Sequence, residues 1–172
     1  MSEGDSFDWL PALLLLQGVM GAIDTIVNHE LLEALPRRPE ARRELALHAG
    51  REAVYAALFL GLGWFAWLGA AALLIGLLLT AEIAITVSDE LIENRIRVLP
   101  QNERALHVFL TLNFGALVAL LVPVLADWWA NPTELAPSYS GWTSWALAAL
   151  GLASAGWSAR DLFASRRLKL KA

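Results

Sequence analysis

The sequence predicts an all-α membrane protein, a single domain of residues 1–172 with about five transmembrane helices. Hydrophobic residues make up 57% of the chain and its mean hydropathy is +0.51, which is too apolar for a domain whose surface must face water. The apolar residues form runs of roughly 20, the length that crosses about 30 Å of hydrocarbon. The chain has no cysteine, so a metal site would have to use nitrogen and oxygen ligands.

Five apolar runs predict the helices, over residues 8–33, 43–62, 65–94, 104–126 and 141–164. Pro36 and Pro39 separate the first run from the second, because proline is not accommodated inside a helix. Pro100 separates the third run from the fourth in the same way. The second and third runs are nearly continuous, so we expect a tight turn near Gly61 and Gly63 between them.

The basic residues predict the orientation of these helices. All 13 Lys and Arg residues lie at the junction of the first two helices, at the junction of the third and fourth, or toward the C-terminus. The N-terminus and the segment 127–141 carry Glu3, Asp5, Asp8, Asp127 and Glu134 instead. Short basic segments stay on the cytoplasmic side, which predicts an inner (cytoplasmic) membrane protein with an external N-terminus and a basic cytoplasmic tail at 165–172.

An internal repeat accompanies this arrangement. Two pairs of segments match at an offset of about 60 residues: NHELLE at 28–33 with SDELIE at 88–93, and ELALH at 44–48 with ERALH at 103–107. The matches predict two similarly oriented helical hairpins, 8–62 and 65–126, related by a pseudo-twofold axis along the membrane normal. These hairpins would form a four-helix bundle, with the helix at 141–164 as an additional element.

Ionisable side chains are abundant in the predicted spans, where each costs about 2.5 kcal/mol or more at a helix centre and usually marks function. Glu44 and His48 are four residues apart, as are Glu103 and His107, so each pair lies on one helical face. Adding one glutamate from each remaining helix gives the candidate metal ligands Glu30, Glu44, His48, Glu90, Glu103 and His107. We expect additional ligands, or groups that orient the ligands, among Asp24, His29, Glu52, Glu82 and Asp89.

One carboxylate from each of two helices and a Glu/His pair from each of the other two resembles the ligand pattern of the ferritin-like di-iron carboxylate proteins. The resemblance covers the first four predicted helices, and the pairs here are Glu-x-x-x-His where that family has Glu-x-x-His. It implies a four-helix bundle that binds two transition-metal ions. Iron is the first expectation, and manganese or zinc would accept the same ligands.

The leading functional hypothesis is an oxygen-dependent di-iron membrane oxidoreductase, a hydroxylase or desaturase of a lipid-soluble substrate. Its expected partners are the lipid bilayer, that substrate and a cytoplasmic electron donor, with no nucleic acid. A metal-ion or proton transporter is an alternative, because carboxylates from Glu30 down to Glu52 and Glu82 could form a pathway. A zinc-dependent membrane hydrolase and a structural subunit of a membrane complex are further alternatives.

Several other acidic residues have a structural interpretation. Glu33, Glu40 and Glu93 are expected in the headgroup zone, paired with arginines of the loops. Glu44 and Glu103 lie in first helical turns, where the helix dipole favours a carboxylate in any case. The deeper acids are harder to explain in this way, because Arg51 is the one basic residue predicted near them.

Overall fold

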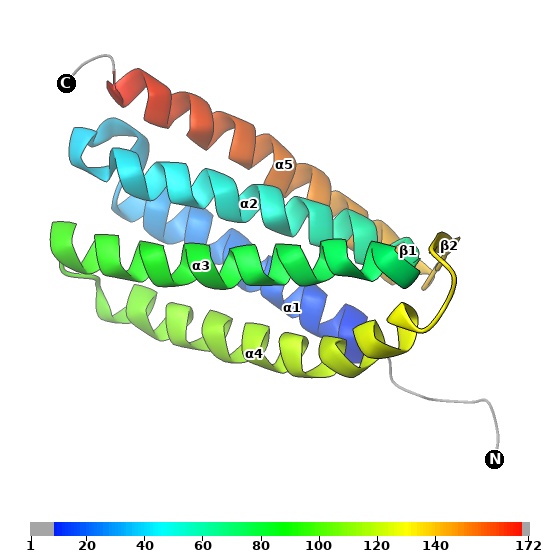
Figure 1. Cartoon of the computed structure of the whole chain (residues 1–172). Coiled ribbons are helices and arrows are strands. Elements are labelled where there is room, and N and C mark those ends of the chain that lie inside the picture. Colours follow the sequence, from blue (N-terminus) through cyan, green and yellow to red (C-terminus); the bar gives the residue numbers. More distant parts are fainter. Residues whose placement is uncertain (1–8, 170–172) are drawn as a thin grey trace.

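The computed structural model describes residues 9–169 and shows long helices that run alternately up and down one bundle (Figure 1). The prediction of an all-α fold is confirmed. The long elements are α1 (Trp9–Ile23) with its continuation η1 (Asp24–Leu32), α2 (Arg42–Leu62), α3 (Ala72–Ile96), α4 (Gln101–Trp129) and α5 (Trp142–Lys169). The predicted external acids Glu3, Asp5 and Asp8 and the last residues of the basic tail, 170–172, lie outside the described residues.

Short 3-10 turns join the helices where proline was expected to break them. The turns η2 (Leu35–Arg37) and η3 (Pro39–Ala41) connect η1 to α2, and each has proline at one of its first two positions. Pro100 directly precedes α4, where its fixed φ and missing N–H suit a helix start. These two breaks therefore occur where the sequence predicted them.

The connection between α2 and α3 is not the tight turn expected near Gly61 and Gly63. Strand β1 (Phe65–Leu68) and the 3-10 turn η4 (Gly69–Ala71) follow α2, and β1 pairs antiparallel with β2 (Glu134–Pro137) from the α4–α5 connection. Gly69 has φ +58°, a conformation that favours glycine, and a Cβ there would lie 2.6 Å from Thr133. The pairing was not predicted, because a strand of four residues has no signal until its distant partner is known.

The fifth helix completes the bundle, although the sequence suggested that it stands outside the hairpins. α1 packs on α4 and α3 packs on α2, while α5 lies along α2 and also reaches α1 (Figure 1). Glycines allow this approach, since a Cβ on Gly18 would lie 2.6 Å from Leu150 and one on Gly151 would lie 2.7 Å from Leu60. The pseudo-twofold relation between the hairpins remains a prediction.

The apolar core occupies the half of the bundle nearer the two strands, where Leu58, Ile75, Leu117, Leu121 and Leu147 are almost completely buried. Large apolar side chains also cover the outer surface, as for Leu77 at 64% and Leu112 at 65% exposure. A contiguous apolar exterior of this kind is suited to lipid.

Four helices in the described part of the chain are long and apolar enough to cross a membrane: Trp9–Leu32, Pro39–Leu62, Gly69–Ile96 and Gln101–Trp129. The predicted fifth span, 141–164, is not among them, because α5 carries many Ser, Thr, Trp and Gly residues. It nevertheless runs the length of the bundle beside α2 (Figure 1).

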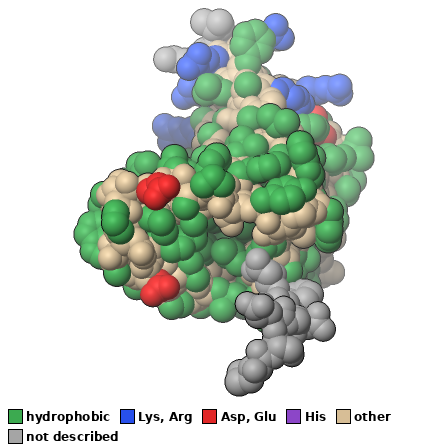
Figure 2. Space-filling model, turned by 90° about the vertical axis from the view of Figure 1, so that its right-hand side faces the viewer, with side chains coloured by type: hydrophobic (Ala, Val, Ile, Leu, Met, Phe, Trp, Pro, Cys, Tyr) green, Lys and Arg blue, Asp and Glu red, His purple; other side chains and the backbone are tan. Residues whose placement is uncertain are grey.

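The two ends of the bundle differ in charge. The α1–α2 and α3–α4 connections and the C-terminal end of α5, which carry the arginines, lie at the same end (Figure 1). Figure 2 looks at the opposite end, which is mainly hydrophobic with isolated acidic groups, while Lys and Arg appear only behind it along the upper edge. The segregation of basic residues seen in the sequence is therefore also a segregation in space.

Candidate metal centre

A π-helix aligns the first two groups of the centre. In η1 the backbone bonds span five residues, as in the bond from Glu33 N–H to Asn28 O at 2.8 Å. Residues five apart in an α-helix point about 140° away from each other, but the wider π turn brings Asp24 and His29 onto one side. Asp24 Oδ2 lies 3.4 Å from His29 Nε2, and Asn28 Nδ2 donates to Asp24 Oδ1 at 2.7 Å.

Four side chains from η1 and α4 converge as ligands of one ion would. Asp24, His29, Glu103 and His107 each present an atom, and these atoms lie within 4.8 Å of one another. Asp24 Oδ2 is 3.3 Å from His107 Nε2, and His29 Nε2 is 3.7 Å from Glu103 Oε1. Metal–ligand distances near 2.1 Å imply ligand separations of about 3.0–3.4 Å, so the group needs little contraction to hold an ion.

His29 is the least satisfied side chain of this group. Its exposed fraction is 4%, and neither Nδ1 nor Nε2 has a hydrogen-bond partner among the described residues. A buried polar group without a partner costs about 1–3 kcal/mol, so a native structure rarely keeps one unless something binds there. Its ring lies 4.2 Å from that of His48, centroid to centroid, which makes protonating both imidazoles unfavourable.

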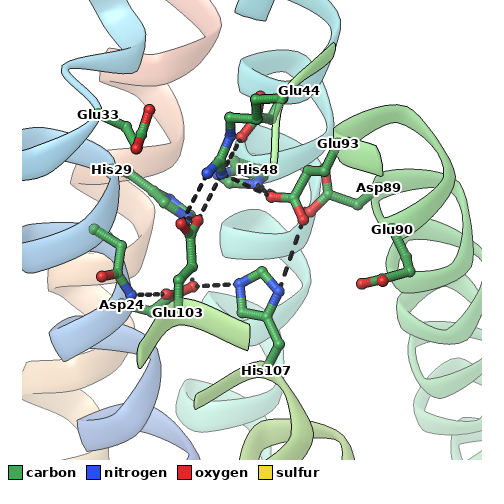
Figure 3. A network of polar contacts seen from close by, with 12 residues as sticks. Asp24, His29, Glu33, Glu44, His48, Asp89, Glu90, Glu93, Glu103 and His107 are labelled. Atoms are coloured by element: carbon green, nitrogen blue, oxygen red, sulfur yellow. Dashed lines mark hydrogen bonds and ion pairs between the residues drawn. The ribbon is translucent and has the colours of Figure 1, made fainter. Parts of the chain in front are cut away.

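A second group from α2 and α3 adjoins the first (Figure 3). His48 Nε2 lies 2.9 Å from Asp89 Oδ2 and 3.9 Å from Glu93 Oε1. The other oxygen of Glu93, Oε2, lies 3.7 Å from His107 Nδ1. Glu93 therefore stands between the two repeat-related histidines, in the position of a carboxylate that would bridge two ions.

This position of Glu93 corrects the sequence-based interpretation. Glu33, Glu40 and Glu93 were all expected among headgroups, paired with loop arginines. Glu33 does pair with Arg38, at 2.7 Å, and Glu40 is exposed. Glu93 also pairs with a loop arginine, Arg97, at 3.3 Å, but it is 1% exposed rather than among headgroups, because the last turn of α3 directs it into the bundle.

Arg97, just beyond α3, joins three carboxylates at the basic end of the centre. Its Nη2 lies 2.9 Å from Glu44, 3.3 Å from Glu93 and 2.6 Å from Glu103. Burial alone would lower the pKa of Arg97, but the hydrogen bonds to Glu103 and Glu44 raise it, so the guanidinium stays charged. Sequence reasoning missed this role of Arg97, since it was counted only among the basic residues that predict the orientation.

Buried carboxylates outnumber arginines around the centre. Six of them, Asp24, Glu44, Glu82, Asp89, Glu93 and Glu103, lie near Arg51 and Arg97, and a seventh buried acid, Asp161, pairs with Arg160 on α5. Arg51 lies 2.9 Å from Asp89 and 3.5 Å from Glu82, and Arg97 contacts Glu44, Glu93 and Glu103. Protonated His48 and His107, which lie 2.9 Å from Asp89 and 3.3 Å from Asp24, would supply further positive charge. Cations bound by neutral histidines would supply the same charge.

The remaining predicted residues divide between the centre and its surroundings. Glu30 does not join the centre: both of its oxygens accept hydrogen bonds from Arg160 on α5, one of them at 2.6 Å. Glu90 is exposed and bonded to Asn94, although its carboxylate can still reach a group with Glu93 and His107. Of the predicted ligands, Glu44, His48, Glu103 and His107 all belong to the polar network of Figure 3, in which Arg97 joins Glu44 to Glu103 and Glu93 lies between His48 and His107.

A cavity of about 220 Å³ adjoins the centre. His29, His48 and Asp89 contribute to one end, with Glu52 and Glu82 in the wall, and Phe59 and Leu150 are among the apolar residues at the other end. Glu82 accepts a hydrogen bond from Thr86 at 3.1 Å, and Glu52 Oε2 is buried without a partner in the described residues. The cavity thus joins a polar, acidic end to an apolar one.

Polar contacts continue part of the way toward the strands. Gln17 Nε2 donates to Tyr55 Oη at 2.8 Å, and Asn113 Nδ2 donates to Gln17 Oε1 at 2.7 Å and to the Leu13 carbonyl at 3.0 Å. Beyond this layer the centre of the bundle is filled by apolar residues such as Leu117 and Leu121. The polar interior is therefore closed toward the strand end.

Comparisons of the sequence with protein families and with curated proteins, and of the fold with solved structures, gave no match. The functional argument accordingly rests on the geometry of the centre.

Proposed function

We propose that this protein is an integral membrane oxidoreductase with two transition-metal ions, iron in the first place, that hydroxylates or desaturates a lipid-soluble substrate. The observation that carries the proposal is the convergence of Asp24, His29, Glu103 and His107 around one point, with Nε2 of buried His29 contacting Asp24 and Glu103 outside hydrogen-bond geometry and its Nδ1 without a partner in the described residues. His29, His48 and Glu93 form the adjoining group of potential ligands, and we assign His48 and Glu93 to the second ion, with Asp89 as the acceptor that orients His48. Manganese or zinc would accept the same ligand types.

The orientation follows from charge. The end that carries the loop arginines faces the cytoplasm, in keeping with the distribution of basic residues in short connections. The candidate centre lies near that end, within reach of a soluble cytoplasmic electron donor. The strand end, with its mainly hydrophobic surface (Figure 2), faces the opposite side of the membrane.

The reaction requires iron, dioxygen and two electrons, which the side chains cannot supply. Bound iron would activate dioxygen. In a hydroxylation, one oxygen atom of O₂ enters a C–H bond and the other leaves as water, with two electrons from the donor and two protons from solvent. The protein would hold the ions through His and carboxylate groups, neutralise Glu44 and Glu103 with Arg97, and exclude water through the apolar core.

The transporter alternative receives less support. A transported ion needs polar groups that reach both faces of the membrane. The polar contacts in the described bundle stop at Gln17 and Asn113, and Leu117 and Leu121 close the interior beyond them. A cavity that ends in an apolar wall instead suits an enzyme whose substrate enters from lipid.

Metal analysis of the purified protein tests the centre. We expect about two iron or manganese ions per chain, because the ligands form two adjoining groups. His48→Ala and His107→Ala should each remove much of the metal, whereas the controls Glu33→Ala and Glu40→Ala should retain it. The proposal fails if the wild-type protein binds no iron, manganese or zinc in supplemented medium and both histidine variants behave like it.

A second experiment tests the reaction class. Iron-loaded protein in lipid nanodiscs is reduced with dithionite and exposed to ¹⁸O₂, and the lipids are then analysed by mass spectrometry. A hydroxylase gives lipids that contain ¹⁸O, and a desaturase gives lipids that are two mass units lighter. Zinc-loaded protein is the control, because zinc has no redox chemistry. Cleaved lipid from the zinc-loaded sample would favour a hydrolase instead.

A further inference from the structure

The cavity beside the centre reaches the surface at two places. Glu90 and Thr111, on α3 and α4, are exposed and line it, and so do Ala22, Ile26 and Ala153, on α1 with its continuation η1 and on α5. The second of these gaps, between α1 and α5, has no charged residue among its exposed lining residues. We call this gap the lateral opening. The surface of α1 next to it is apolar, with Leu16 at 48% and Val19 at 50% exposure, so the opening faces the hydrocarbon of a surrounding bilayer rather than water.

Two contacts between the same helices frame the lateral opening. On the strand side, Gly18 packs against Leu150 so closely that a Cβ would lie 2.6 Å away. On the cytoplasmic side, Glu30 forms an ion pair with Arg160, whose guanidinium also lies over the Trp157 ring at 5.1 Å. Leu150 and Arg160 are about 15 Å apart along α5 at 1.5 Å per residue, which sets the height of the opening.

Small residues keep the lateral opening free between these contacts. Gly21 lines the cavity, and a Cβ built on it meets no atom within 4 Å. Its neighbours at the opening are alanines, Ala22 and Ala153. The gap is therefore narrow in width but unobstructed, which suits an extended hydrocarbon chain.

We propose that the substrate is a single unbranched acyl chain, which enters from the bilayer through the lateral opening and lies along the cavity with its reacting carbons beside His29 and His48. This inference rests on the proposed function, since it specifies the substrate of the same site. The polar head of the lipid stays near the Glu30–Arg160 pair, at the cytoplasmic edge of the opening.

The lining of the cavity favours a hydrocarbon chain, because most of the residues away from the centre are apolar or small. Phe59, Phe114 and Leu150 line the inner end of the cavity. Contacts between the end of the acyl chain and these residues would replace the contacts that the chain makes with other lipids in the bilayer.

Photolabelling of the metal-loaded protein in detergent tests the site. The probe is hexadecanoic acid with a diazirine near its terminal carbon, and labelled positions are mapped by mass spectrometry, with metal content measured on the same samples. We expect labels at the inner end of the cavity, on Phe59, Phe114 and Leu150. Gly21→Leu should reduce this labelling at least about tenfold, because it fills a space the chain needs.

A matched control and a second variant make the result interpretable. Gly76→Leu also introduces leucine where a Cβ meets nothing within 4 Å, but Gly76 is on α3 and outside the cavity lining; its labelling should match the wild type. Ala153→Phe narrows the opening from α5 and should act like Gly21→Leu. Both blocking variants should keep their metal, which shows that they fold.

The proposal is overturned if Gly21→Leu and Ala153→Phe are labelled like the wild type while retaining metal. It is also overturned if a sterol or a two-chain phospholipid displaces the probe as well as unlabelled hexadecanoic acid does. Labelling that follows the prediction in protein without metal would support the acyl-chain site and refute only the di-metal centre.

Discussion

Replacing His29 by leucine tests whether His29 is a metal ligand. For a ligand, the change in unfolding temperature should have opposite signs in metal-free and metal-loaded protein. For an ordinary buried histidine, the sign should be the same in both. Both ring nitrogens of His29 are buried without a hydrogen-bond partner in the described residues. In metal-free protein, a leucine removes that penalty of about 1–3 kcal/mol, so the variant should unfold at the same or a higher temperature than the wild type. In metal-loaded protein the order should reverse.

The size of the reversal follows from linkage. An ion present at 100 times its dissociation constant stabilises the folded state by about 2.7 kcal/mol. For a chain of this length that free energy corresponds to a shift in Tm of roughly 5–10 °C. Wild-type protein should therefore lose about this much Tm on chelation, and His29→Leu should lose clearly less, because one of the two ions has lost a ligand.

The assay is thermal unfolding in detergent, with and without EDTA, on samples of measured metal content. Asn113→Leu is the control: Asn113 is also buried and polar, but it bonds Gln17 and the Leu13 carbonyl outside the centre. It should lower the Tm by the same amount with and without EDTA. The reasoning is refuted if EDTA leaves the wild-type Tm unchanged while His29→Leu is less stable in both conditions.

Three further predictions concern charge and topology. Arg97→Met should destabilise metal-free protein by about 3–5 kcal/mol, because Glu44 and Glu103 lose their buried cation. Added Mn²⁺ should recover part of the lost Tm. The control Arg95→Met, at an exposed position, should have little effect on the Tm. Glu30→Gln should leave metal content unchanged, because Glu30 pairs with Arg160; loss of metal would return Glu30 to the ligand set. A reporter fused after residue 172 should be cytoplasmic and one inserted near Pro132 external, and finding both on one side would refute the orientation.

The sequence predicted part of the centre because helical spacing determines which residues share a face. Four residues of separation put Glu44 on the same face as His48 and Glu103 on the same face as His107, and all four belong to one polar network in the structure (Figure 3). The repeat added the expectation that the two pairs meet. The spacing argument and the repeat argument do not depend on how the helices pack in detail. They could therefore predict that these four side chains point into the same polar network.

On the other two helices the structure buries the neighbours of the first-choice ligands. Glu30 and Glu90 are equivalent in the repeat and were assigned as ligands, but their predecessors His29 and Asp89, expected as additional ligands, are the buried residues, and Glu90 remains within reach of Glu93 and His107. One residue is a rotation of about 100° about a helix axis, and an amphipathic pattern in a lipid-facing helix is too weak to fix that angle. The repeat was informative, but the rotation of each helix had to come from packing.

The π-helix and Arg97 could not be predicted for different reasons. A π turn has no characteristic residue pattern, so the alignment of Asp24 with His29 emerges only from the backbone. Arg97 lies in a loop, where the positive-inside rule explains it without any further role. Its contact with three carboxylates depends on the path of the chain between α3 and α4.

The two halves of the bundle meet different physical requirements, and this division favours a cation-dependent function. Near the strands, an apolar core and the close helix contact at Gly18 can maintain the fold without any ligand. Near the basic end, buried carboxylates outnumber the arginines, and a protein under selection for stability alone would gain by replacing them with apolar residues. Several buried acids beside a histidine whose Nδ1 has no partner in the described residues are costly for stability alone. This cost is the physical reason for proposing a cation site at the basic end of the bundle, with the strand end as its scaffold.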